Sequence, residues 1–458
     1  MADPSTLHTR ALELIARYEP LFGAFAQAGH ELVIVGGAVR DLCLGREVDF
    51  DVDFATSALP EETIAALDAA RIRHFPLGIR FGTIAARYQG RQLEITTYRV
   101  EERYEAGSRH PEVAFGRVLH DDLGRRDLSV NAMALRPDGS LYDPFDGQGA
   151  LASRRLEVPG GGYERTLTIL ADDPLRILRI ARFAARLDFE PTDDTTRAAS
   201  ERATTLQAIS HERWKAELDK LLVAPFAPRG WAWLARTGAL HEVLPEADAM
   251  ARQPLDGWVL GAGALPPEPV PRWAWLLFAS RLAEAGVALA DATLRGAWPD
   301  DATLVAQVHE LARRLRWSLE ERERVVATLS CPVSLDEAAG LGERGLRRWV
   351  ASSGQGIDDR LLLLAALGRA AGREPDAVAV ASRVAALRAS DDPTPVLPPG
   401  LGHQVVRRAG IPPGPRLGAA IDALKAAIID GDVSNRDDID SYAAWLCAWI
   451  ARHEAQQG

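Results

Sequence analysis

Three aspartates recur at every second position in the stretch EVDFDVDFAT, residues 47–56. They are Asp49, Asp51 and Asp53, and apolar residues separate them. Because alternate side chains of a β-strand share one face, we expect the three carboxylates to point the same way. Like charges at this spacing repel one another unless a positive charge lies against them. Since the stretch holds no Cys or His, it suits a hard cation, Mg²⁺ or Mn²⁺, whose other ligands are phosphate oxygens.

Two glycines upstream of these aspartates provide a candidate phosphate site. Gly36 and Gly37 end the apolar run ELVIV, just before one or two predicted helical turns. Bare backbone N–H groups at such a turn approach an anion closely, and Arg40, one turn further on, can add a charged fork. A Gly-Gly turn together with an Asp-x-Asp strand is the skeleton of metal-assisted nucleotidyl transfer. The alternative interpretations are an ordinary tight turn and an acidic, solvated edge strand.

The whole stretch VGGAVRDLCLGREVDFDVDFATSALPEE resembles the first signature of the class II tRNA nucleotidyltransferase and poly(A) polymerase family, in the polymerase β superfamily. In that family the metal-binding pair is the Asp-x-Asp that precedes a hydrophobic residue and Ala-Thr. The resemblance therefore implies that Asp51 and Asp53 are the metal ligands. Asp49 would lie ~13 Å from Asp53 along a strand, so it stays unassigned.

A second stretch, RRDLSVNAMAL, comprises residues 125–135 and resembles the family motif RRDF-x-x-NA, with Leu128 in place of Phe. The resemblance implies that Arg126 and Asp127 lie against the sugar of the nucleotide. Asp127 is then expected to accept a hydrogen bond from the ribose 2′-OH, which distinguishes ribose from deoxyribose. By itself, Arg-Arg-Asp is also typical of a surface cluster of ion pairs.

The third stretch, DDPLRILRIARFAARLDFEP, predicts one amphipathic helix over residues 172–191. Asp172 is expected to be its N-cap or first-turn acid, and arginines recur every three residues along one flank. That flank is either solvated or functional. The stretch resembles the family's E-D-x-x-R motif, with Asp172 in the Glu position. The resemblance implies that Asp173 and Arg176 read the base and that Arg179 and Arg182 bind the nucleotide.

The chemistry of an Asp–Arg pair predicts which bases it accepts. A carboxylate accepts a hydrogen bond from the N4 amine of cytosine or the N6 amine of adenine, while an arginine donates to the neighbouring ring nitrogen. Uracil and guanine present a carbonyl where the amine would be, and a carboxylate repels it. Such a reader therefore selects C and A without a nucleic-acid template.

Weaker signals lie elsewhere in the chain. Glu94, on the strand of a predicted hairpin that turns at Gln89-Gly90, is a candidate supporting carboxylate or an ordinary exposed residue. His120 and Asp121 are interpreted as a surface pair rather than a hydrolase motif. The charged stretch 100–115 fits a mobile loop, which in the family is required for the switch from C to A addition. The candidate RNA contacts near the C-terminus are Arg407, Arg408 and Arg416.

Composition and patterning suggest an ordinary globular protein with an acidic balance. The chain has 458 residues, a net charge of −11 and three cysteines far apart in sequence, so disulfides and a Cys-based zinc site are not expected. No apolar run is long enough to span a membrane, which together with the cysteines favours a cytoplasmic enzyme. The negative net charge argues against a protein that coats nucleic acid non-specifically. An acidic chain can still carry a local basic surface that binds nucleic acid.

Element patterns predict an α+β N-terminal head, a small mixed sheet flanked by helices, followed by an all-α neck, body and tail. A second hairpin is expected to turn at residues 137–139. In the family's terms, the predicted domains are a nucleotidyltransferase catalytic head at 1–150, a neck with the nucleotide-templating helix at 151–222, a helical body at 223–395 and a tRNA-binding helical tail at 396–458.

The predicted function is that of a metal-dependent CCA-adding tRNA nucleotidyltransferase, which uses CTP and ATP and releases pyrophosphate. Two alternatives share this chemistry: the A-adding enzyme of a split CC/A system, and a bacterial poly(A) polymerase. An inactive RNA-binding relative is disfavoured because the carboxylates Asp51 and Asp53 and the phosphate-site residue Arg40 are all present.

Overall fold

The computed structural model describes residues 3–48, 52–76, 78–103, 112–248, 256–289, 291–293, 301–330 and 333–454. The chain divides into two compact units, Met1–Ala251 and Arg252–Gly458, here called unit 1 and unit 2. The finer domain boundaries near residues 150, 222 and 395 stay predictions.

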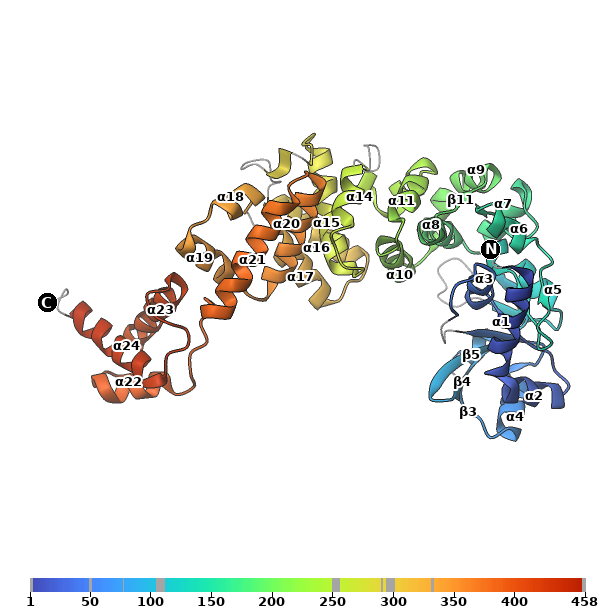
Figure 1. The fold of residues 1–458 in the computed structure, drawn as a ribbon, viewed down its shortest axis with the longest axis horizontal. Coiled ribbons are helices and arrows are strands. Elements are labelled where there is room, and N and C mark those ends of the chain that lie inside the picture. The colour runs from blue at the N-terminus through green and yellow to red at the C-terminus, as the bar shows by residue number, and fades with distance from the viewer. Residues whose placement is uncertain are drawn as a thin grey trace. The chain divides into compact units, whose positions relative to one another are not determined.

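Unit 1 is built on a mixed sheet of seven strands in the order β3-β4-β5-β2-β1-β8-β9, in which β2 and β5 are parallel and the other pairs antiparallel. Helix α4 packs against β3–β5, as Figure 1 shows in blue. The strands are β1 (Leu32–Val35), β2 (Asp53–Thr56), β3 (Arg73–Phe75), β4 (Thr83–Tyr88), β5 (Arg91–Thr97), β8 (Ala134–Leu135) and β9 (Leu141–Tyr142); a separate pair is formed by β6 (Arg99–Arg103) and β7 (Glu112–Phe115).

Both predicted hairpins are present in this sheet. Gln89 and Gly90 have φ of 48° and 80° between β4 and β5, which is the left-handed geometry of a tight hairpin turn. The second hairpin joins β8 to β9, with Gly139 at φ 80°. The predicted fold class, a small mixed sheet with flanking helices followed by a mainly helical region, is confirmed.

The strand predicted over residues 47–56 is shorter than expected. β2 begins only at Asp53, which pairs with Val35, the last residue of β1. The ladder ends there because Gly36 turns the chain away with φ of 72° and ψ of −130°. Asp49 and Asp51 lie outside the described residues.

The helix predicted over residues 172–191 is shorter than expected, and the expected place of Asp172 at its N-terminus is wrong. Helix α7 ends at Asp172, and α8 (Arg176–Leu187) begins after a break, so Asp172 is a C-terminal rather than an N-terminal residue. Pro174 causes the break because proline forces the preceding residue out of the helical region. Accordingly Asp173 is extended, with φ of −145° and ψ of 98°.

The helices of unit 1 surround the sheet and continue beyond it. They are α1 (Pro4–Ala16), α2 (Glu19–Gln27), α3 (Gly37–Cys43), α4 (Pro60–Ala69), α5 (Leu119–Gly124), α6 (Gly147–Ala152), α7 (Tyr163–Asp172), α8, α9 (Asp193–Arg202), α10 (His211–Leu222), α11 (Ala227–Arg236) and α12 (Ala239–Val243). Helix α8 packs against both α10 and α11.

All regular secondary structure in the described part of unit 2 is helical, and its apolar clusters include one within 335–387 and a separate one within 401–450. In the described part of the chain, no helix is both long and apolar enough to cross a membrane. The helices are α14 (Asp256–Ala262), α15 (Pro269–Glu284), α16 (Asp301–Arg314), α17 (Leu319–Leu329), α18 (Leu335–Gly340), α19 (Glu343–Ser353), α20 (Ile357–Ala370), α21 (Glu374–Asp391), α22 (Leu401–Ala409), α23 (Pro415–Asp430) and α24 (Ile439–Glu454).

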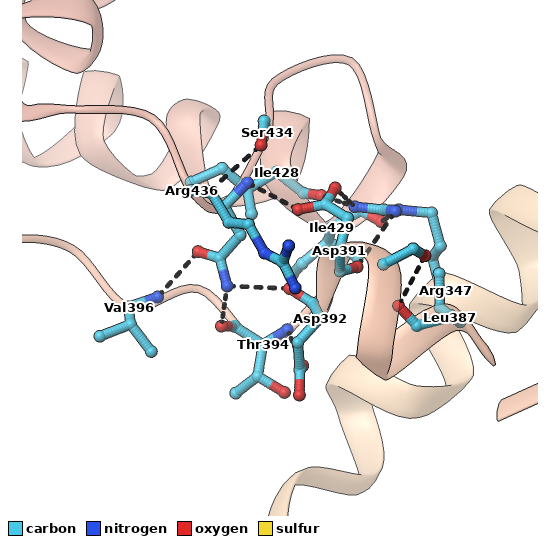
Figure 2. A network of polar contacts seen from close by, with 12 residues as sticks. Arg347, Leu387, Asp391, Asp392, Thr394, Val396, Ile428, Ile429, Ser434 and Arg436 are labelled. Atoms are coloured by element: carbon cyan, nitrogen blue, oxygen red, sulfur yellow. Dashed lines mark hydrogen bonds and ion pairs between the residues drawn. The ribbon is translucent and has the colours of Figure 1, made fainter. Parts of the chain in front are cut away.

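A buried arginine joins these two clusters. Arg347 on α19 is 4% exposed, and its guanidinium donates to the carbonyls of Ile428 and Ile429 at 2.8 and 3.0 Å and to Asp391 at 2.9 Å (Figure 2). The last carbonyls of a helix have no partner inside it, so Arg347 caps α23. Gly431 permits the approach, since a Cβ there would lie 2.9 Å from Arg347 Nε.

Asn435 completes this Arg347 network from the other side of the Pro-rich connection at 392–400. Its Nδ2 donates to the carbonyls of Asp392 and Thr394 at 2.8 and 2.7 Å, and its Oδ1 accepts from the N–H of Val396 at 3.1 Å. The sequence of this Pro-rich connection is typical of a loose linker, yet its backbone is held by hydrogen bonds to Asn435.

We expect Arg347→Ala to lower the free energy of unfolding of unit 2 by about 2–4 kcal/mol, because the buried hydrogen bonds to Asp391 and to the carbonyls of Ile428 and Ile429 are lost. The matched control is Arg348→Ala on the same helix, whose ion pair with Asp430 is exposed on the arginine side and contributes little. Hydrogen exchange of the amides of α22–α24 measures both variants. Equal protection in the two would contradict the assigned role of Arg347.

Candidate active site

One cleft of about 950 Å³ in unit 1 collects every described residue that the sequence assigned to nucleotide or metal binding. Ten basic and seven acidic side chains line it, so a local basic surface does exist in this acidic chain. The predicted residues along its walls are Gly36, Gly37, Arg40, Asp53, Arg126, Asp127, Asp173, Arg176, Arg179 and Arg182. Asp51 lies outside the described residues.

Two carboxylates, of Asp53 and Glu94, occupy partnered positions on neighbouring strands that line the cleft. Asp53 on β2 is the register partner of Glu94 on β5, and both are exposed and line the cleft. Neighbouring strands lie about 4.8 Å apart, and partnered side chains share one face of the sheet. Glu94 is therefore favoured as a supporting carboxylate over an ordinary surface residue.

The glycine turn brings backbone and arginines close to these carboxylates. A Cβ at Gly36 would lie 3.4 Å from Arg126 Nη1 and 3.8 Å from Asp53 Oδ2. Arg40 is 2% exposed, forms a bidentate pair with Asp41 at 3.0 Å and donates to Asn131 Oδ1 at 2.8 Å. Its guanidinium is therefore held in one orientation beside the turn.

Sequence reasoning missed Asp122, which organises the two arginines of the Arg-Arg-Asp motif. This carboxylate is 1% exposed and accepts from Arg126 Nη2 at 3.0 Å and Arg125 Nη2 at 3.2 Å. Burial by itself raises the pKa of Asp122, but the charges of Arg126 and Arg125 outweigh burial and hold the pKa below its usual value. Its position four residues before Arg126 on α5 was the available signal.

Asp127 is 6% exposed and already carries several hydrogen bonds. Arg179 donates to its Oδ2 from Nε and Nη2 at 2.9 and 2.6 Å, and Asn131 donates to its Oδ1 at 3.2 Å. Burial raises the pKa of Asp127, but the charge of Arg179 and the bond from Asn131 outweigh it and lower the pKa to about 2. A carboxylate accepts about four hydrogen bonds, so room for one hydroxyl remains.

The predicted base-reading residues lie on opposite sides of the break between α7 and α8. Asp173 Oδ1 accepts from the N–H of Leu175 at 3.2 Å, and its Oδ2 accepts from Arg213 at 2.8 Å. Arg176 donates to the carbonyls of Ile169 and Arg125, both at 2.8 Å. Both side chains line the cleft, and both are held there by hydrogen bonds to other parts of the chain.

The flank of arginines on α8 is largely removed from solvent. Arg182 is 7% exposed and donates to Glu217 on α10 at 2.5 Å, so a solvated basic flank is the wrong interpretation for it. Of the weaker signals, His120 is exposed and contacts the Phe145 ring, as expected of a surface residue, and Arg408 pairs with Asp440. Much of the predicted loop at 100–115 lies outside the described residues.

The donor chemistry of the cleft suits a hard cation. Asp53 and Glu94 offer oxygen ligands on adjacent strands, with no histidine or cysteine among the residues that line the cleft. Over the residues with described positions, no group of three or more His, Cys, Asp or Glu side chains is arranged to hold a metal. Asp51 lies outside the described residues, so the predicted pair Asp51 and Asp53 stays a prediction.

Two family models match the chain on either side of α7 and α8. Residues 32–157 match the model described as "Poly A polymerase head domain", and residues 188–250 match "Probable RNA and SrmB- binding site of polymerase A". With its mixed sheet and charged cleft, unit 1 therefore contains a nucleotidyltransferase head.

Relatives identify the family more closely. A CCA-adding enzyme of a Geobacillus species is 41% identical over 212 residues, 46% of this chain and half (50%) of that protein's length. The CCA-adding enzyme of Geobacillus thermodenitrificans is 32% identical over 427 residues, 91% of this chain and 93% of that protein. The solved structure of the Bacillus stearothermophilus CCA-adding enzyme in complex with CTP has a TM-score of 0.71 at 27% identity, covering 96% of this chain and 99% of that one. The chain belongs to the family of CCA-adding enzymes, which confirms the predicted family and enzyme class.

We expect Gly36→Ala to slow nucleotide addition at least about tenfold, because a Cβ there strains the backbone and fills the space beside Arg126 and Asp53. The control is Gly29→Ala, which has a similar positive φ of 81° but nothing within 4 Å of the new methyl group. Both variants should lose about 1–2 kcal/mol of stability, whereas only the first should lose activity. Equal loss of activity would show that strain alone is responsible.

The depressed pKa of Asp127 predicts a pH-dependent contribution to stability. The contribution is complete above the unfolded-state value near 4 and is lost as the pH falls towards about 2, a change of roughly 2–3 kcal/mol. Urea unfolding at several pH values should therefore show a gap between wild type and Asp127→Asn that is largest at pH 7 and shrinks below pH 4. Glu61→Gln, at an exposed position of α4, serves as the control, and parallel curves for wild type and Asp127→Asn would contradict the prediction.

Proposed function

We propose that this chain adds C, C and A in turn to the 3′ end of tRNA, from CTP and ATP and without a nucleic-acid template, with release of pyrophosphate. The observation that carries the proposal is the convergence of all ten described candidate residues on one cleft. Membership of the CCA-adding family supports it. A cytoplasmic location belongs to the same proposal.

In this proposal Asp173 and Arg176 read the base. The carboxylate accepts from the exocyclic amine of cytosine or adenine, and the guanidinium donates to the adjacent ring nitrogen. Both side chains are already held by other parts of the chain, Asp173 by Arg213 and Arg176 by two backbone carbonyls. A reader that is oriented before binding loses less conformational entropy when the nucleotide arrives.

The sugar and phosphates are assigned to other residues of the same cleft. Asp127 keeps an acceptor site for the ribose 2′-OH, while Arg126 has a buried Nε without a hydrogen-bond partner in the described part of the chain. Arg179 and Arg182 add positive charge beside the nucleotide. Gly36, Gly37 and Arg40 hold the triphosphate through backbone N–H groups and a fixed guanidinium.

Asp51 and Asp53 are assigned as ligands of Mg²⁺ or Mn²⁺, with Glu94 in a supporting position. A bound divalent cation would supply activation of the attacking hydroxyl and stabilisation of the departing pyrophosphate. The chain's own contribution is to align Asp53 and Glu94 on paired strands and to hold the phosphates opposite them.

Product length decides between this proposal and its alternatives. Purified protein is given Mg²⁺ and a tRNA that ends at the discriminator base, first with CTP alone and then with CTP and ATP. We expect two added nucleotides with CTP alone and three with CTP and ATP. Addition of A only to a tRNA that already ends in CC would indicate the A-adding enzyme, a long A tail would indicate a poly(A) polymerase, and no extension would refute the proposal.

The metal assignment makes a separate prediction. Asp51→Ala and Asp53→Asn should each reduce incorporation by about 1,000-fold or more, and Glu94→Gln by about ten- to a hundredfold, because charge opposite the phosphates is lost. Circular dichroism should show an intact fold in all three. Glu61→Gln, at an exposed position of α4, is the control. Retained turnover in Asp53→Asn would refute the assignment.

A further inference from the structure

Helix α10 carries two oppositely charged side chains, one turn apart, that bind residues of the cleft. Arg213 Nη2 donates to Asp173 Oδ2 at 2.8 Å, and Glu217, 5% exposed, accepts from Arg182 Nε at 2.5 Å. Residues four apart lie on one face of a helix. A single face of α10 therefore places Arg213 against the acidic Asp173 and Glu217 against the basic Arg182. Neither residue belongs to the motifs that suggested the site.

The two base-reading residues are not paired with each other. Asp173 binds Arg213 and the N–H of Leu175, while Arg176 donates to backbone carbonyls. Among the residues with described positions, no ion pair within 4.0 Å joins Asp173 to Arg176. Each side chain therefore keeps the edge that faces the cleft available to a base.

Arg213 is the group that keeps Asp173 apart from Arg176. Asp173 is three residues before Arg176, a spacing at which Asp–Arg pairs form readily on a helical turn, and other arginines also line the cleft. A carboxylate without an outside anchor would turn towards one of them. That pairing would consume the acceptor oxygen that meets the amine of cytosine or adenine.

We propose that Arg213 is a positioning residue for base selection: its ion pair with Asp173 holds the carboxylate edge open to cytosine and adenine and closed to uracil and guanine. This inference rests on the proposed function, because it concerns how the assigned base reader is held. Arg213 acts through Asp173 and is not assigned a contact with the nucleotide.

The test compares how strongly the enzyme prefers CTP to UTP. Single-turnover addition to a tRNA ending at the discriminator base gives kcat/KM for each nucleotide in wild type, Arg213→Gln and Arg213→Lys. The control is Lys215→Gln, which removes the 2.7 Å pair with Asp219 from the same helix without touching a residue that lines the cleft. Thermal unfolding of every variant reports on the fold.

We expect the preference for CTP over UTP to fall about ten- to a hundredfold in Arg213→Gln, the range of one hydrogen bond to a charged group. Arg213→Lys should lower it about threefold, because an ammonium keeps the charge but not the planar fork. Lys215→Gln should leave it unchanged. If Arg213→Gln does not fold, the comparison of Arg213→Lys with wild type provides the test.

Other outcomes overturn the inference in distinguishable ways. An equal loss of activity with CTP and UTP in Arg213→Gln, at an unchanged preference, would reduce Arg213 to a structural role. A changed preference in Lys215→Gln would show that any weakening of α10 has the same effect. If wild type extends tRNA and the Arg213 variants keep its preference for CTP over UTP, only this inference is refuted. If wild type adds no C or A, the proposed function is refuted and the inference with it.

Discussion

A buried guanidinium needs an acceptor for its N–H groups, and this requirement connects α8 to the rest of unit 1. Arg182 reaches Glu217 on α10, and Arg179 reaches Asp127 in the loop after α5. Arg176 reaches backbone carbonyls of α7 and of the segment after α5. Because an unpaired buried charge costs several kcal/mol, these segments must come together for α8 to pack at all. The charged cleft follows from that packing.

The carboxylates on the sheet obey a different constraint, which is register. Asp53 and Glu94 face the cleft together only because β2 and β5 pair in parallel with these residues as partners. A shift of one residue would turn one of the two carboxylates to the opposite face of the sheet. The turn at Gly36, which ends the ladder of β1, also lies beside both Arg126 and Asp53, since a Cβ there would be 3.4 and 3.8 Å from their side-chain atoms. One backbone geometry thus serves both the sheet and the site.

Unit 2 shows how a polar network can replace apolar packing at a junction. Its two clusters are separated in sequence by a Pro-rich connection, yet Arg347 and Asn435 satisfy backbone groups on both sides of it. The sequence pattern of prolines and glycines is typical of a linker, because it shows where regular structure stops. It does not show which distant side chains will bind the exposed carbonyls.

Local sequence determined much of this protein. The turns at Gln89-Gly90 and Gly139, the order of strands and helices, and the candidate residues of the cleft all follow from residue type and spacing, helped by the resemblance of three motifs to one family. These features depend on interactions between near neighbours, which the sequence displays directly. Even so, the helix expected to begin at Asp172 begins only at Arg176, because Pro174 keeps the residue before it out of the helical conformation.

Tertiary structure alone decided which charged residues meet. Arg213 and Glu217 looked like ordinary surface residues in sequence, but Arg213 is placed against Asp173 and Glu217 against Arg182. Arg213 and Asp173 are separated by 40 residues, so no local spacing could pair them. The physical reason is that an ion pair depends on distance in space, and that distance is set by how α8, α10 and the sheet pack, not by position along the chain.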